Sequence, residues 1–190
     1  MVKLLCLTSV VILLALLSAP SVQAAPNRLF LDLGAGWAGT SLHQDTTGLP
    51  PENYRELARD EQGMLFDFRA GVNINKRLAM YMTHRWTNIT TDELDNPVPH
   101  DVTFSLTALG ASYRFRSEAP TFYLTAGAGK ATWNDEDGIG GFYGAGYQVT
   151  TNMAVEITEM SGDMGALYFA FGGTNGTFTT TALTLVYRLQ

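Results

Sequence analysis

The sequence predicts an all-β fold, an eight-stranded antiparallel up-and-down transmembrane β-barrel preceded by a cleaved signal peptide. Three observations predict it. Apolar and polar residues alternate in many stretches with the two-residue period of a strand. The connections between these stretches alternate between long and short, as in a barrel with one simple and one elaborate rim. The polar rows carry glycines and charges of both signs but almost no lysine, which favours a membrane barrel over a soluble one.

The N-terminal residues 1–24 are typical of a Sec-type export signal, so we expect the barrel to occupy 25–190. Lys3 supplies the positive start, 4–17 form an apolar core, and small residues precede the expected cleavage point. The single cysteine, Cys6, lies inside this signal, which excludes disulfides and thiolate chemistry from the mature chain. A net charge of -6 argues against nucleic acid as a partner.

Three stretches in the first half of the chain alternate regularly. In 29–37 the odd positions are apolar, whereas the even positions include an acid and two glycines. In 66–74 the even positions are apolar and the odd positions are polar or glycine. In 78–85 leucine and methionine alternate with alanine, tyrosine, threonine and arginine. Each stretch predicts a strand with two different faces, because successive side chains of a strand point to opposite sides.

The second half supplies the remaining strands. Stretches 153–158 and 183–189 alternate regularly. Stretches 102–115, 121–133 and 139–149 are less regular, but they are rich in aromatic residues, threonine and glycine and are bounded by turn residues. No other apolar run reaches the roughly 18 residues that a spanning helix needs, so any membrane crossing must use strands.

One of the irregular strands, 102–115, has an internal conflict. Phe104 and Leu106 share one parity, whereas Tyr113 and Phe115 share the other. Either a bulge lies between the two pairs, or the assignment of faces along this strand is wrong. The long connections are expected at 39–61, 89–101, 134–138 and 161–176, and the short ones at 75–76, 116–120 and 150–151.

Charged residues on the polar rows predict an ionic network inside the barrel. Eight strands leave an interior just wide enough for side chains to fill, and buried ions need partners. We therefore expect a plugged lumen of charged and small side chains rather than an aqueous pore. The predicted network comprises Asp32, Asp67, Arg69, Arg85, Glu156 and Arg188.

Aromatic residues near the predicted strand ends are typical of the girdles that membrane barrels place at the lipid–water interfaces. The residues concerned are Trp37, Trp86, Tyr113, Phe115, Phe122 and Tyr187.

The motifs Gly-Ala-Ser-Tyr-Arg-Phe at 110–115, Gly-Ala-Gly-Tyr at 144–147 and Asn-Met-Ala-Val-Glu at 152–156 are similar to those of small bacterial outer-membrane barrels, the OmpA transmembrane domain and OmpX-like members of the porin family. The resemblance implies a Gram-negative cell envelope, contact with outer-membrane lipid and lipopolysaccharide, and insertion by the barrel-assembly machinery. That machinery reads a C-terminal aromatic residue, whereas this chain ends in Leu189 and Gln190.

His84 is the candidate catalytic residue, since it continues an apolar row that we expect to face lipid. It resembles the catalytic histidine that outer-membrane lipid A deacylases place on this wall two positions before a serine, but Trp86 occupies that position here. A hydrolase would therefore use His84 with a hydroxyl of the adjoining strand, Ser105 or Thr107, as nucleophile, and Glu93 or Asp92 as acid. The alternative is that His84 and Trp86 lie in the wet, amphipathic interface.

An apolar stretch at 166–171 follows a predicted break at 161–163 and should project beyond the membrane. It is either a surface for adhesion or partner binding or one arm of a protruding hairpin that pairs with 177–181. The possible contact residues are Leu167, Tyr168, Phe169 and Phe171.

The sequence thus predicts a non-enzymatic outer-membrane barrel whose long loops act in envelope integrity or in contacts with an external protein or surface ligand. A lipid A acyl hydrolase, a small-solute channel and a soluble ligand-binding barrel are the alternatives. No cofactor is expected. No metal site is expected either, because His43 and His100 lie in predicted loops without a ligand spacing.

Overall fold

The structure is a computed structural model that describes residues 29–44, 60–90, 101–133, 136–167 and 174–189, and all five ranges are built from strands and tight turns. The eight strands are β1 (Leu29–Gln44), β2 (Asp60–Asn73), β3 (Leu78–Thr90), β4 (Asp101–Arg114), β5 (Thr121–Trp133), β6 (Glu136–Gln148), β7 (Met153–Leu167) and β8 (Thr174–Leu189).

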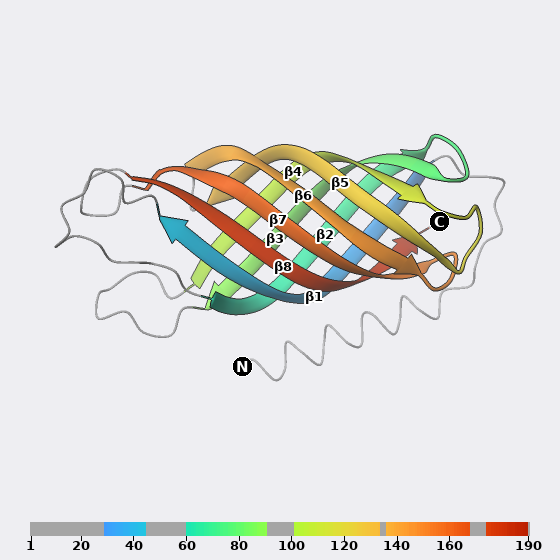
Figure 1. Ribbon diagram of the computed structural model, residues 1–190, viewed down its shortest axis with the longest axis horizontal. Coiled ribbons are helices and arrows are strands. Elements are labelled where there is room, and N and C mark those ends of the chain that lie inside the picture. The colour runs from blue at the N-terminus through green and yellow to red at the C-terminus, as the bar shows by residue number, and fades with distance from the viewer. Residues whose placement is uncertain (1–28, 45–59, 91–100, 134–135, 168–173, 190) are drawn as a thin grey trace.

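The strands pair in chain order, and β8 pairs with β1, so the sheet closes into a barrel of antiparallel strands (Figure 1). The predicted fold class is confirmed. The predicted signal peptide lies outside the described residues. The described part contains no helix long and apolar enough to cross a membrane.

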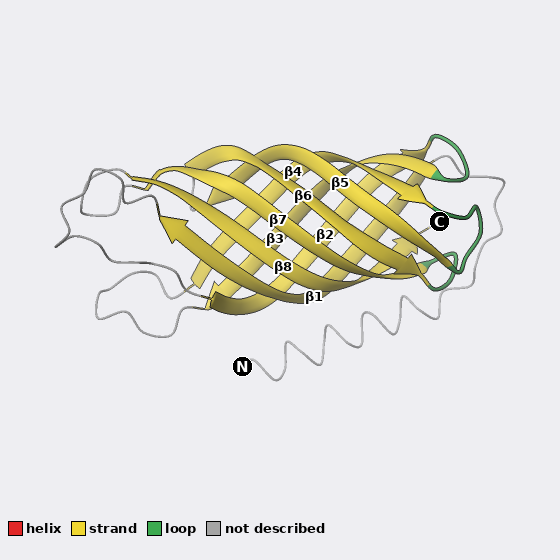
Figure 2. Ribbon diagram, viewed as in Figure 1, coloured by secondary structure: helices red, strands yellow, loops and turns green. Residues whose placement is uncertain are grey.

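The two ends of the barrel differ. The turns 74–77, 115–120 and 149–152 lie together at one end, drawn in green at the right of Figure 2. In the first of them the Asn75 side chain accepts hydrogen bonds from the backbone N–H groups of Arg77 and Leu78, both at 2.8 Å, which is how asparagine favours a tight turn. At the opposite end the strands stop next to 45–59, 91–100, 134–135 and 168–173, which lie outside the described residues.

The two faces of the strands are oriented as the alternation predicts. Phe68, Met80 and Met82 lie on the outer wall and are 41%, 52% and 56% exposed, whereas the ionisable residues of the neighbouring positions are buried in the interior. Charged side chains therefore point to the barrel axis and large apolar side chains point outward.

The bulge considered for β4 is wrong, and the assignment of faces along this strand is what needs correction. The register between β3 and β4 runs without interruption from Leu78 opposite Tyr113 to Thr90 opposite Asp101. Phe104 and Leu106 have no exposed surface and lie inside the barrel. Apolar residues occur on both faces of β4 because the interior of the barrel is apolar at the level of Phe104.

The predicted break at 161–163 is also wrong, because β7 continues to Leu167. Gly162 occupies an inward position of this strand, where an added Cβ would meet Ala131 and the ring of Phe178. Glycine is therefore present to make room for a neighbouring ring, not to form a turn. The irregularity lies further along, where the register with β8 shifts between Met164 and Ala166.

The interior has two sections, which corrects the expectation of a lumen filled only by charged and small side chains. Near the long connections the buried residues include many large apolar side chains, together with threonines such as Thr40, Thr87 and Thr180. This apolar layer comprises Leu65, Ile89, Phe104, Leu106, Phe142, Met160 and Phe178. The charged residues lie between this layer and the short turns. Large apolar side chains fill the interior without needing ionic partners, and the pattern of charged rows in the sequence does not reveal them.

Candidate functional site

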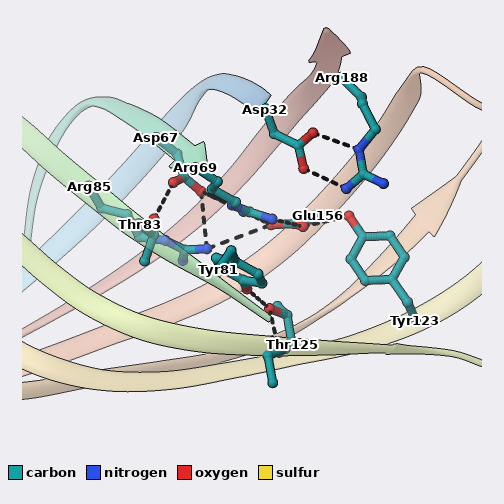
Figure 3. Close-up of polar contacts among 11 residues, drawn as sticks. Asp32, Asp67, Arg69, Tyr81, Thr83, Arg85, Tyr123, Thr125, Glu156 and Arg188 are labelled. Carbon is teal, nitrogen blue, oxygen red and sulfur yellow. Dashed lines mark hydrogen bonds and ion pairs between the residues drawn. The ribbon is translucent and has the colours of Figure 1, made fainter. Parts of the chain in front are cut away.

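The ionic layer consists of four charged side chains from three strands. Asp67 and Arg69 lie on β2, Arg85 on β3 and Glu156 on β7, and each is at most 4% exposed. The alternation of each strand turns all four toward the axis, and barrel closure brings β7 across from β2 and β3 (Figure 3). Two cations and two anions make this layer neutral as a whole.

Arg69 connects the two carboxylates. Its Nε donates to Asp67 Oδ2 at 2.8 Å, and its Nη1 donates to Glu156 Oε1 at 2.6 Å. The other terminal nitrogen contacts both acids as well. A planar guanidinium with five donors suits such bidentate contacts. Arg69 therefore links β2 to β7 through the middle of the barrel, although these two strands do not pair with each other.

Arg85 is the second cation of the layer and has fewer contacts. Its Nη2 lies 3.1 Å from Asp67 and 3.8 Å from Glu156. None of its three guanidinium nitrogens makes a hydrogen bond to the described part of the chain. The guanidinium instead lies over the ring of Phe142, with its carbon 3.9 Å from the ring centroid. A cation–π contact in a water-free place contributes about 2 kcal/mol, so Phe142 joins the ionic layer to the apolar layer.

Hydroxyl groups also donate hydrogen bonds to both carboxylates of the ionic layer. Thr83 donates to Asp67 Oδ1 at 2.6 Å, and the Tyr123 hydroxyl donates to Glu156 Oε1 at 2.5 Å. Tyr123 reaches Glu156 across β6, where the intervening position in register is Gly146. A Cβ at Gly146 would overlap the Tyr123 ring, so glycine is required for this close approach.

The other predicted charges form a separate pair at the short-turn end. Arg188 Nε and Nη2 donate to Asp32 Oδ1 and Oδ2 at 2.7 and 2.8 Å (Figure 3). The guanidinium carbon also lies 4.0 Å from the centroid of the Phe30 ring. Asp32 lies on β1 and Arg188 on β8, so this pair links the first and last strands where the barrel closes. The structure thus divides the six charged residues singled out from the sequence into a group of four and a group of two.

The structure also places residues that sequence reasoning missed. Tyr81 and Tyr123 belong to the polar interior, and the Tyr81 hydroxyl hydrogen-bonds Thr125. A signal existed for Tyr81, because it shares a row with Thr83 and Arg85. No local signal existed for Tyr123, whose role depends on the register of β6. A small cavity of about 30 Å³ lies between the ionic layer and the short turns. Arg69, Tyr81 and Tyr123 form part of its lining.

His84 lies on the outer wall, as predicted for its row. Its Nδ1 is hydrogen-bonded to Thr107 Oγ1 at 2.8 Å, and Thr107 is its partner in register on β4. Of the two hydroxyls considered on this strand, Thr107 is therefore the one beside His84, whereas Ser105 is opposite Trp86. Glu93 lies outside the described residues. Among the described carboxylates of the outer wall, Glu159 accepts a hydrogen bond from Tyr143 at 2.6 Å on strands remote from His84.

The six aromatic residues expected at the interfaces all have outward parity. Trp37, Tyr113, Phe115 and Phe122 are 60%, 44%, 52% and 64% exposed. Trp86 is half-buried and stacks on Phe66 with ring centroids 5.4 Å apart. Tyr187 is 9% exposed, beside Leu33 and Met153 in register.

Most of the residues considered for surface contacts lie outside the described residues. Leu167 is the last residue of β7, whereas Tyr168, Phe169 and Phe171 lie outside the described residues. The part of the chain that is described contains no group of three or more histidine, cysteine or acidic residues that could hold a metal ion.

Comparison with known proteins finds similarity in structure but not in sequence. No family model matches the chain, and no curated protein matches it. Among solved structures, Ail, the attachment invasion locus protein of Yersinia pestis, has a TM-score of 0.53 at 14% identity, covering 84% of this chain and 98% of Ail. Neisserial surface protein A has a TM-score of 0.51 at 16% identity, covering 83% of this chain and 96% of that protein. The closed barrel described above therefore has the fold of the small eight-stranded outer-membrane proteins.

Proposed function

We propose that this chain is a non-enzymatic protein of the bacterial outer membrane, a closed barrel whose long connections act outside the cell in envelope integrity or external contacts. One observation carries the proposal, namely the inverted burial of the two faces. Arg85 and Glu156 are 0% and 1% exposed, whereas apolar residues such as Leu109 and Ile157 are 70% and 60% exposed on the outer wall. An apolar surface that encircles the molecule is stable in lipid and not in water.

The strand lengths support a barrel that extends beyond the membrane. A tilted strand needs about 9–11 residues to cross a bilayer, whereas β1 and β8 each have 16. The surplus lies toward the long connections, since the opposite end closes in tight turns. External contact through that end agrees with the names of the structural neighbours, one a surface protein and the other an attachment protein. Further partners in this proposal are outer-membrane lipid, lipopolysaccharide and the barrel-assembly machinery.

The filled interior argues against the channel alternative. The ionic layer and the apolar layer lie one above the other along the axis, and the apolar layer contains side chains such as Phe104 and Phe178 that have no exposed surface. A solute would have to displace both layers. Breaking the buried ion pairs alone would leave unpaired charges, which costs several kcal/mol.

We expect the refolded protein to show heat-modifiable migration on a detergent gel and no discrete conductance in planar bilayers. The first result reports a closed barrel that resists detergent, and the second reports a lumen without an aqueous path. An outer-membrane porin measured in the same bilayers provides the control. Stable conductance steps would contradict a closed lumen and favour the channel, and recovery of the protein from periplasm without detergent would contradict the membrane location.

The alternative of a lipid A acyl hydrolase rests on one observation, the hydrogen bond between His84 and Thr107 on the outer wall. A histidine hydrogen-bonded to a hydroxyl supplies two of the three groups of a catalytic triad, the base and the nucleophile. The described residues place no carboxylate beside the other ring nitrogen of His84, so the arrangement lacks the group that orients the base.

We expect lipid A isolated from cells that express His84→Asn or Thr107→Val to give the same mass spectrum as lipid A from cells that express the wild type. Cells without the protein provide the baseline. Loss of one acyl chain in the wild-type sample, together with its retention in both variants, would establish the hydrolase and contradict the non-enzymatic proposal.

A further inference from the structure

A groove lies on the outer wall at the short-turn end of the barrel, beside the turn that joins β4 to β5. It has a volume of about 510 Å³. We call it the rim groove, and its lining residues are Phe115, Arg116, Pro120, Thr121, Phe122 and Tyr147. Three of these are aromatic residues with outward rings, so the groove has an apolar wall next to a guanidinium group.

The geometry of the rim groove is fixed by its hairpin. The backbone N–H of Phe115 donates to the carbonyl of Phe122 at 3.0 Å, and the N–H of Arg116 donates to Thr121 Oγ1 at 3.0 Å. Phe122 and Tyr147 are partners in register, and their ring centroids are 4.7 Å apart. The groove is therefore formed before any ligand arrives, which lowers the entropy cost of binding.

The charge at this end of the barrel is positive. The exposed charged residues on the described short turns are Lys76, Arg77, Arg116 and Glu118, and none of the four forms an ion pair with another described residue. At the opposite end Lys130 is already paired with Asp137 at 2.6 Å. The Arg116 guanidinium is thus available to an external anion, and it matches a phosphate group in shape and charge.

We propose that the rim groove binds an anionic glycerophospholipid, whose phosphate contacts Arg116 and whose glycerol and upper acyl chains pack on Phe115, Phe122 and Tyr147. The proposal rests on the membrane location proposed above. Aromatic rings beside a cation fit an amphipathic ligand, because a free phosphate ion gains nothing from the apolar wall. The net positive rim favours a headgroup with net negative charge over a zwitterionic headgroup, whose own cation offsets its phosphate.

The test uses the full mature barrel in nanodiscs of phosphatidylcholine mixed with phosphatidylglycerol, followed by native mass spectrometry of the lipids that remain bound after transfer to detergent. We expect the wild type to retain phosphatidylglycerol in preference to phosphatidylcholine. Arg116→Gln removes one exposed charge-assisted contact and should lower phosphatidylglycerol retention about fivefold. Phe122→Ala, which removes one side of the apolar wall, should lower retention of both lipids.

Lys130→Gln provides the matched control, because it removes an exposed cation at the other end of the barrel. Equal retention of the two lipids by the wild type, or equal losses in Arg116→Gln and Lys130→Gln, would overturn the lipid site. Each sample is also run unboiled on a detergent gel. A wild type that shows no folded band would contradict the membrane barrel itself, whereas a folded wild type without lipid preference would contradict only this site.

Discussion

Replacement of Arg69 by methionine should lower the free energy of unfolding of the barrel by about 3–5 kcal/mol, because it leaves two buried carboxylates with one cation between them. Arg69 donates hydrogen bonds to both Asp67 and Glu156. The second cation, Arg85, lies 3.8 Å from Glu156 and makes no hydrogen bond to it. Urea titration of the refolded protein, read by the proportion of the folded band on an unboiled gel, measures the change.

Two further variants test whether the loss of charge balance causes the destabilisation of Arg69→Met. Lys130→Met removes an ion pair whose side chains are 59% and 53% exposed, and such a pair contributes at most about 1 kcal/mol. The double variant Arg69→Met/Glu156→Gln removes one charge of each sign and leaves the 3.1 Å pair of Arg85 and Asp67. It should be more stable than Arg69→Met alone, because fewer buried charges lack a partner. A double variant that is less stable than Arg69→Met would show that packing, not charge balance, holds the layer.

Phe142→Ala is expected to have an effect of similar size, about 3–5 kcal/mol, because truncation of a buried phenylalanine leaves a cavity. Phe142 is 3% exposed. Its ring lies over Arg85 and beside Tyr81, and Gly110 and Gly127 lie so close to it that neither has room for a side chain. Loss of the ring removes apolar packing and also the cation–π contact of a guanidinium that has no hydrogen bond in the described part of the structure.

The matched control is Phe122→Ala, since Phe122 is 64% exposed on the outer wall and its loss creates no internal cavity. Its effect on unfolding should be clearly smaller. Phe142→Leu fills most of the cavity without restoring the aromatic face, so its destabilisation should lie between those of the wild type and Phe142→Ala. Equal stability of Phe142→Leu and the wild type would exclude a contribution from the ring above Arg85.

The strands were predictable because their alternation is a local property. The row that contains Met80 and Met82 and the row that contains Tyr81 and Thr83 can be separated from the sequence alone. The lengths of the strands were harder to predict, because polar residues and glycines near strand ends resemble turn residues. Gly162 is an example, since only the neighbouring ring in the structure shows why glycine is needed there. The signal peptide stays a prediction.

The charged interior was only partly predictable. That Asp67, Arg69, Arg85 and Glu156 face inward follows from parity. Which of them contact one another depends on the positions of β2, β3 and β7 around the closed barrel, and no local pattern encodes those positions. The same holds for the hydrogen bond from Tyr123 to Glu156 across Gly146.

Alternation by itself determined that this chain forms two-faced strands, and the scarcity of lysine determined which face is outside, because both are properties of residue type and spacing. Only the tertiary structure decided that the interior is ionic near the short turns and apolar near the long connections. The reason is that barrel closure and strand register set which inward side chains share a level along the axis. A phenylalanine such as Phe104 has the same local pattern whether it faces lipid or the interior of the barrel.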